Sequence, residues 1–310
     1  MKARARAFHR NRHRGNNLPE AVLPAGVSRH VERSLQKQWN RYRKELKRCQ
    51  RKFSEKAVHN SRVAARRLSA TIELLENFLP PELLKKGRCL IKEHLDIFDD
   101  LRDAQVQLVA VNSLQATFPA ARPFCEWLQK REGRFSKRTR TCVKRSKTKP
   151  LAKVIAAAED AFEKELKKLT RDNAAKLLVH SIDKAFSRTM RLKQRIRTAR
   201  PKTIHCTRVA FKRFRYMVEL LADHLSADDK MLAEMQHYQT MMGDIQDAEV
   251  LLQCFDKFIR KKNIRSESAK QLREELLRRR RWLIKVYMDA AGQLREFWST
   301  GLKHKVSVGR

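Results

Sequence analysis

Acidic residues, glycine, proline and aromatic side chains are all scarce in this sequence, and each shortage excludes a class of structure. The 310 residues include 34 Asp and Glu against 71 Lys and Arg, which leaves a formal net charge of +37. Such an excess excludes the balanced surface of an ordinary neutral enzyme. Eight glycines and eight prolines are too few for the many turns of a strand-rich fold, and the abundant Leu, Ala, Lys, Arg, Glu and Gln favour helices. The sequence therefore predicts an all-α fold.

Cysteine pairs and long apolar runs are also missing. The six cysteines lie far apart without a CxxC pair, which excludes the usual zinc-site spacing and a compact disulfide framework, so free thiols in a reducing compartment are expected. No apolar run approaches the about 18 residues of a membrane span, and the Arg-rich start lacks the apolar stretch of a secretory signal. We expect a cytoplasmic protein with a basic, disordered arm over residues 1–24 and a tail over 301–310. A mitochondrial transit peptide is the alternative interpretation of the arm.

The most informative feature that is present is an internal repeat. Residues 58–68 return as residues 204–214, and in both copies a histidine is followed by basic residues at the same spacing. Further along, the Asp-Ala-x-Val segment at 102–106 returns at 246–250. Because the matches occur in the same order at offsets of 144 to 147 residues, they indicate a duplicated unit.

The duplication sets the expected domain organisation. Helical periodicity begins near residue 28 and is interrupted only by short proline-containing or polar segments. We expect two tandem four-helix bundles, the first over residues 25–170 and the second over residues 171–300.

The first copy of the repeated helix is basic on one face and apolar on the other. At about 100° per residue, Arg62 and Arg66 lie within about 60° of His59, opposite a stripe of Ala, Ile and Leu. Residues 56–72 contain no acid. The second copy repeats this pattern, with Arg208, Lys212 and Arg215 beside His205.

Two further cationic stripes precede these helices. A solvated helix face normally mixes Glu with Lys, yet residues 184–218 carry twelve Lys or Arg without an acid, and residues 133–158 carry nine. Because such crowding of like charge destabilises a compact chain, a polyanionic ligand that neutralises it is expected. Arginine forks suit phosphate oxygens, and His59 and His205 could donate to the same oxygens. The two stripes consist of Lys37, Arg41, Lys44 and Arg48, and of Lys184, Arg188, Arg191 and Arg195.

The paired HxxRxxx[KR]R helices, each followed about 40 residues later by an [RQ]-D-A-x-V segment, resemble the CHAD family, the conserved histidine α-helical domain. The resemblance covers about residues 25–300, and it implies two bundles related by a pseudo-two-fold axis, with a basic cavity or pore between them that binds inorganic polyphosphate. The chain departs from the pattern at Ser69, where the second copy has Arg215, and at Gln246, where the first has Arg102, so the halves could contribute unequally. By this resemblance the lining positions are His59, Arg62, Arg66, Arg67, His205, Arg208, Lys212, Arg213 and Arg215.

An acidic segment offers an alternative interpretation. Residues 99–103 read DDxxD, and the spacing i, i+3, i+4, i+7 predicts one shared helical face for Asp96, Asp99, Asp100 and Asp103. In all-α isoprenoid synthases such a motif holds Mg²⁺ against a diphosphate, with a second acidic motif about where Asp244 and Asp247 fall. The basic stripes have no counterpart in that chemistry, so we expect Asp103 and Asp247 to neutralise and orient neighbouring arginines instead.

Nucleic-acid binding is the other alternative, because a pI near 10.6 is also typical of nucleic-acid binders. Aromatic residues are only 7% of the chain, and Tyr216 is the one that falls on a basic stripe, so base stacking has little to use. No catalytic motif stands out. The sequence therefore predicts a non-enzymatic, cytoplasmic polyphosphate-binding protein without metal or cofactor, with weak non-specific nucleic-acid binding as a side activity. Association with polyphosphate granules and service to a partner enzyme are both compatible with this prediction.

Overall fold

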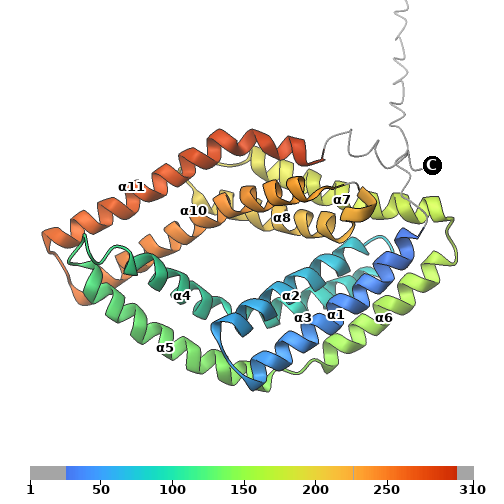
Figure 1. Cartoon of the computed structure of the whole chain (residues 1–310), viewed down its shortest axis with the longest axis horizontal. Coiled ribbons are helices and arrows are strands. Elements are labelled where there is room, and N and C mark those ends of the chain that lie inside the picture. Colours follow the sequence, from blue (N-terminus) through green and yellow to red (C-terminus); the bar gives the residue numbers. More distant parts are fainter. Residues whose placement is uncertain (1–25, 226, 299–310) are drawn as a thin grey trace, which may run out of the picture.

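The computed structural model describes residues 26–225 and 227–298, and helices form all of the regular structure in this part of the chain (Figure 1). The all-α prediction is therefore confirmed. The expected arm and tail lie outside the described residues. In chain order the helices are α1 (Val27–Arg51), α2 (Glu55–Leu74), α3 (Pro81–Asp96), α4 (Asp99–Asn112), α5 (Ala121–Arg145), α6 (Lys149–Leu166), α7 (Arg171–Gln194), α8 (Pro201–Leu220), α9 (Ala222–Leu225), α10 (Asp229–Lys262) and α11 (Glu267–Ala290), followed by the 3₁₀ helix η1 (Ala291–Trp298).

Side-chain caps and prolines set where the helices begin. The hydroxyl of Ser54 accepts from the Ala57 amide at 3.3 Å to start α2, and a carboxylate oxygen of Asp228 accepts from the Met231 amide at 2.8 Å to start α10. Thr170 and Ser266 cap α7 and α11 in the same way. Helices α3, α6 and α8 instead have a proline in the first turn, where its missing N–H costs nothing.

One expected helix is broken in the structure. The periodicity predicts a single helix over residues 82–118, but α3 ends at Asp96 and α4 begins at Asp99. At the break, the hydroxyl of Thr139 on α5 donates to the carbonyl of Ile97 at 3.2 Å, so a side chain from outside the helix takes this carbonyl. The equivalent region of the second half stays continuous in the 34-residue helix α10.

The two repeated helices lie next to each other at the centre of the molecule (Figure 1). Helix α2 packs against α1, α3 and α8, and α8 packs against α7, α2 and α10. Beyond this centre, α4 and α5 pack beside α10 and α11 and extend the molecule along its long axis. The basic faces of α2 and α8 are thus brought together by the fold.

Two clusters of buried apolar residues hold the helices, and each contains residues from both sides of residue 170. The larger cluster joins α1, α2, α3 and α6 to α7, α8, the first half of α10 and η1. The smaller cluster lies between α4 and α5 on one side and α10 and α11 on the other, where Phe124 meets Phe255 edge to face with ring centroids 5.0 Å apart. The proposed boundary at residue 170 and the duplication itself stay predictions.

Candidate functional site

Four cations from the two repeated helices come together where α2 meets α8. Arg62 and Arg66 belong to α2, and Arg208 and Lys212 belong to α8. Arg62 is 7% exposed, and the other three are half-buried. Each is close enough to others of the set to influence their protonation. We call these four residues the central cation cluster.

The cluster is electrostatically strained in the absence of an anion. Burial, followed by the charges of Arg66 and Arg208, lowers the pKa of Lys212 to about 6. Burial and the neighbouring Arg62 lower the pKa of Arg66 to about 10. A low-dielectric environment opposes charge on each group, and adjacent cations increase that cost. An anion placed among these side chains would relieve both effects.

Carboxylates from α4 and α10 lie close to the cluster. Asp99 binds Arg62 at 2.7 Å, and burial followed by the charges of Asp99 and Asp247 raises the pKa of Asp103 to about 6. Burial also raises the pKa of Asp247, although the charge of Arg208 opposes this shift. We expected Asp103 and Asp247 to neutralise and orient neighbouring arginines. They lie close enough to Arg62 and Arg208 for these charges to influence their pKa values, but the ion pair with Arg62 is made by Asp99.

The two halves of the site differ at one pair of equivalent positions. Asp99, at the start of α4, neutralises Arg62, whereas the matching place in α10 is Gly243. A Cβ atom at Gly243 would lie 3.4 Å from the Nε and Nη2 atoms of Arg208, so this guanidinium lies directly beside the α10 backbone, where α4 has a carboxylate instead. The Nε atom of Arg208 is buried and has no hydrogen-bond partner among the described residues. Arg208 is therefore the more available of the two arginines for a ligand.

This difference leads to a prediction for Asp99→Asn. Removing the carboxylate frees Arg62, so the affinity for a polyanion should rise several-fold. The measurement is a binding titration with long-chain polyphosphate. Asp100→Asn is the matched control, because Asp100 is an exposed residue 3.9 Å from Arg138 and its replacement changes the net charge equally. Equal gains in the two variants would contradict a specific role for the Arg62–Asp99 pair.

A second prediction follows from the lowered pKa of Lys212. Between pH 6 and about 10 the unfolded chain binds a proton at this residue that the folded chain lacks, so this group makes stability rise with pH. Lys212→Met should remove that slope and raise the Tm at pH 7, while weakening polyphosphate binding. Thermal unfolding at pH 7 and pH 9 measures this slope, and the charge-matched control is Lys37→Met, because Lys37 is an exposed residue of α1. An unchanged slope would contradict the burial of Lys212 among cations.

Three of the predicted lining residues are engaged in ion pairs that join or brace α2 and α8. Arg67 on α2 binds Glu219 on α8 at 3.5 Å, and Arg213 on α8 forms a short ion pair with Glu73 on α2. The two pairs are reciprocal, as in an interface with two-fold symmetry. The third residue, Arg215, binds Glu219 at 2.7 Å and Gln239 at 3.1 Å. Sequence reasoning missed Glu73 and Glu219, although they recur at the same offset as the two histidines.

The two motif histidines occupy different environments. His205 is half-buried beside the cluster, where burial, Arg208 and Lys212 lower its pKa and a side-chain hydrogen bond to Gln246 opposes the shift. Its Nδ1 atom has no hydrogen-bond partner among the described residues. His59, by contrast, is exposed. His205 is thus the histidine placed to donate to an anion in the cluster.

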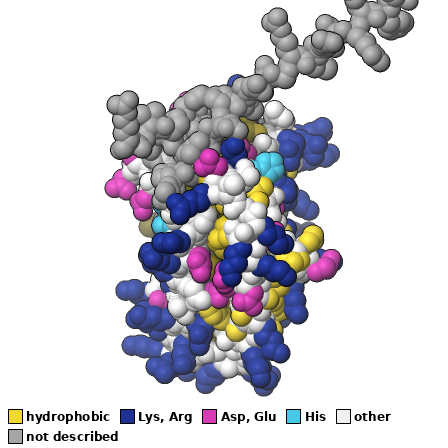
Figure 2. Space-filling view, turned by 90° about the vertical axis from the view of Figure 1, so that its right-hand side faces the viewer, with side chains coloured by type: hydrophobic (Ala, Val, Ile, Leu, Met, Phe, Trp, Pro, Cys, Tyr) yellow, Lys and Arg dark blue, Asp and Glu magenta, His cyan; other side chains and the backbone are white. Residues whose placement is uncertain are grey.

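The cationic stripes on α1 and α7 face solvent, apart from the cluster. All eight side chains are exposed, and some already have acidic neighbours, since Arg48 lies 3.1 Å from Glu45 and Lys184 lies 3.2 Å from Glu76. Arg188 is close enough to Glu73 and Arg213 to influence both. Seen from the end of the molecule, Lys and Arg line both flanks and the lower end of the surface, with fewer acidic side chains scattered among them (Figure 2).

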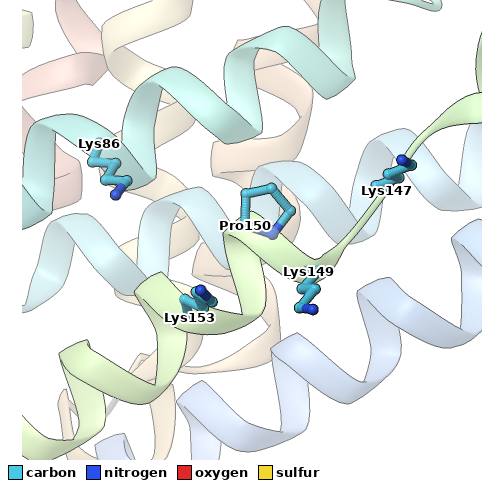
Figure 3. A pocket seen from close by; sticks show the side chains of 5 residues that line it. All are labelled: Lys86, Lys147, Lys149, Pro150 and Lys153. Carbon is cyan, nitrogen blue, oxygen red and sulfur yellow. The ribbon is translucent and has the colours of Figure 1, made fainter.

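A separate cavity of about 300 Å³ opens between α3 and the start of α6 (Figure 3). Four exposed lysines surround Pro150 there, and three of them come from the acid-free stretch 133–158. The cavity shares no residue with the central cation cluster. Its lining residues are Lys86, Lys147, Lys149, Pro150 and Lys153.

The acidic segment that could have held Mg²⁺ is divided by the break between α3 and α4. Asp96 pairs with Lys92 on α3, Asp99 binds Arg62, and Asp100 lies near Arg138. Asp96 therefore lies on a different helix from Asp99, Asp100 and Asp103, contrary to the expectation of one continuous helix. Within residues 26–225 and 227–298, no group of three or more His, Cys, Asp or Glu is arranged to hold a metal ion. In the same segments, no helix combines the length and apolar character of a membrane span.

Comparisons with known proteins agree on one family. The sequence matches the CHAD domain over residues 33–256. The crystal structure of the CHAD domain from the plant Ricinus communis is similar, with a TM-score of 0.57 and 17% identity over 94% of each chain. PptA from Streptomyces chartreusis is similar with a TM-score of 0.58 and 14% identity, covering 87% of this chain and 99% of that one. No curated protein matches the sequence.

Proposed function

Because the chain belongs to the CHAD family, we propose that it binds inorganic polyphosphate and that the central cation cluster holds the polyphosphate chain. The observation that carries the proposal is the convergence of Arg62, Arg66, Arg208 and Lys212 from both repeated helices. Their mutual repulsion is a standing cost to the fold, and a bound polyanion offsets it.

The chemistry of the cluster suits a chain of phosphates. Arginine presents a flat, permanently charged fork to two oxygens at once, and lysine adds a point charge. An anion beside Lys212 raises the pKa of its amine again, so binding near pH 7 takes up a proton there. Protonation of Asp103, whose pKa is about 6, also favours the anion. Affinity should therefore increase as the pH falls from 8 to 6.

The exposed stripes on α1 and α7 provide a second, outer set of contacts in this proposal. A long polyphosphate chain held at the centre extends beyond the cluster, and exposed cations attract it without fixed geometry. Each such contact is weak and is screened by salt. Binding to long chains would also carry the protein to polyphosphate granules.

We propose further that the bound polyphosphate is not cleaved. In support, Asp96, Asp99 and Asp100 each pair with a different cation, so they are already occupied as counter-charges. The test is incubation of polyphosphate, and separately of a prenyl diphosphate, with the protein and Mg²⁺ or Mn²⁺. Metal-dependent release of phosphate or diphosphate that is lost in Asp99→Ala with Asp103→Ala would show an enzyme instead.

The experiment for the binding proposal is a paired titration at moderate salt, with long-chain polyphosphate and duplex DNA at the same phosphate concentration. A flexible chain one phosphate wide can reach half-buried cations that a rigid duplex about 20 Å across cannot, so polyphosphate should bind far more tightly. Affinity should fall with salt, by analogy with counterion release from nucleic acids. Equal affinity for the two polymers would favour the general nucleic-acid alternative.

A further inference from the structure

The outer face of α11 carries an exposed tryptophan that the polyphosphate proposal does not use. Trp282 is 58% exposed, whereas Trp39 and Trp298 are buried and Trp127 is half-buried. The guanidinium of Arg43 lies 5.6 Å from the ring centroid of Trp39, and that of Arg131 lies 4.6 Å from Trp127. Within the described part of the chain, no cation or aromatic ring covers the indole of Trp282 in this way. Its flat surface is therefore free for a ligand.

Cations flank this indole on the same helix. Lys285 lies one turn after Trp282, and Arg281 precedes it directly. Both are exposed, and neither makes an ion pair or hydrogen bond with a described residue. They differ from Arg278, which binds both oxygens of Glu275 at 2.7 Å, and from Arg280, which binds Glu249 at 2.7 Å. The unpaired charges thus lie beside the uncovered ring.

We propose that this face of α11 binds single-stranded nucleic acid, with a base stacked on Trp282 and neighbouring phosphates held by Arg281 and Lys285. A flat aromatic ring beside unpaired cations is the combination that non-specific single-strand binders use, since every base offers a π-face and every linkage a charge. The site goes beyond the proposed function, because polyphosphate has no base to stack. It also revises the expectation that base stacking has little to use.

An anionic membrane surface fits the same face less well. Membrane-surface helices carry a broad apolar stripe, whereas on α11 only Val286 and Met288, at 37% and 39% exposed, accompany Trp282 as exposed large apolar side chains within the described residues. Asp289, two turns after Trp282, ends the basic stretch. One exposed ring beside separate cations suits the bases and phosphates of a single strand better than the apolar interior of a membrane.

The test is tryptophan fluorescence of the full chain titrated with an oligonucleotide of about 12 deoxythymidines, and with an abasic oligonucleotide of equal length. The thymidine oligomer should quench the fluorescence and bind about 5- to 100-fold more tightly than the abasic one. In Trp282→Leu both the quenching and this preference should disappear, while Trp282→Phe should keep part of the preference. Because Trp282 is exposed, neither change disturbs the core.

A polyphosphate titration of the Trp282→Leu variant distinguishes this proposal from the proposed polyphosphate function. Trp282→Leu should bind polyphosphate as the unchanged protein does, whether or not that affinity is high. An unchanged preference for the thymidine oligomer in Trp282→Leu would overturn the site. Quenching by vesicles of phosphatidylglycerol and phosphatidylcholine without quenching by the oligonucleotide would overturn it too, and would assign the face to membranes.

Discussion

Replacing Arg66, Arg208 and Lys212 together with glutamine is expected to lower the affinity for long-chain polyphosphate by more than a hundredfold. Hydrogen bonds that involve a charged partner contribute about 1.5–3 kcal/mol each. Although three neighbouring losses are not additive, a total of about 3 kcal/mol already exceeds a factor of one hundred. Arg215 is left in place because Glu219 and Gln239 hold it within the structure. A binding titration at moderate salt measures the loss.

The matched control replaces three basic residues of the N-terminal arm, residues 1–24. It removes the same three positive charges at positions far from the cluster in sequence. Lys2, Arg4 and Arg6 lie outside the described residues, and replacing them with glutamine should cost much less affinity. Circular dichroism should show unchanged helical content in both variants. Similar losses from the arm and from the cluster would mean that binding is diffuse attraction to a basic protein.

Glu73→Leu is expected to produce the largest loss of stability, about 3–5 kcal/mol in the free energy of unfolding. The Glu73 side chain is 3% exposed. Its carboxylate forms an ion pair with Arg213, and Arg88 lies 3.7 Å from it. Removing one partner of such a pair leaves the other charge half-buried without compensation, which is the costly case. Chemical denaturation of the purified variant measures the change.

The companion double variant Glu73→Leu with Arg213→Leu separates this cause from a general packing defect. When both charges are absent, Arg88 still has Glu76 at 3.6 Å, so the pair leaves no charge without a partner and much of the lost stability should return. A double variant that is less stable than Glu73→Leu would contradict the account of the pair. The reciprocal pair of Arg67 with Glu219 should behave in the same way, but more mildly, because both of its side chains are more exposed.

The content of the cluster could be predicted from sequence because it depends on helical phase. Arg62 and Arg66 lie opposite the apolar stripe of their helix, and the second copy repeats this phase. Burial of the apolar stripe fixes the orientation of each helix about its own axis, and this also fixes the side on which its basic residues lie. The family resemblance implied a basic cavity or pore between the two bundles, but the direct packing of α2 against α8 is a finding of the structure.

The roles of Arg67, Arg213 and Arg215 could not be read from phase. Glu73 and Glu219 stand just beyond the acid-free windows, and which cation each reaches depends on how α2 crosses α8. Their recurrence at a shared offset was a usable signal, because paired acids across a duplicated contact form reciprocal ion pairs.

Other features depend on tertiary contacts that the local sequence does not encode. Neither proline nor glycine marks the break between Asp96 and Asp99. The hydroxyl that donates to the Ile97 carbonyl at this break belongs to Thr139, about 40 residues later in the chain. The exposure of Trp282 likewise reflects which side of α11 packs on α10, since tryptophan next to a run of arginines is compatible with either side. Gly243 became informative only when Arg208 was found against it.

The most direct measurement of the central claim is a crystal structure of the protein with a polyphosphate of about ten phosphates. The account predicts phosphate oxygens within hydrogen-bonding distance of Arg66, Arg208 and Lys212, between α2 and α8. Density for the polyphosphate only along the exposed stripes of α1 and α7, with the central cation cluster left without phosphate, would contradict it.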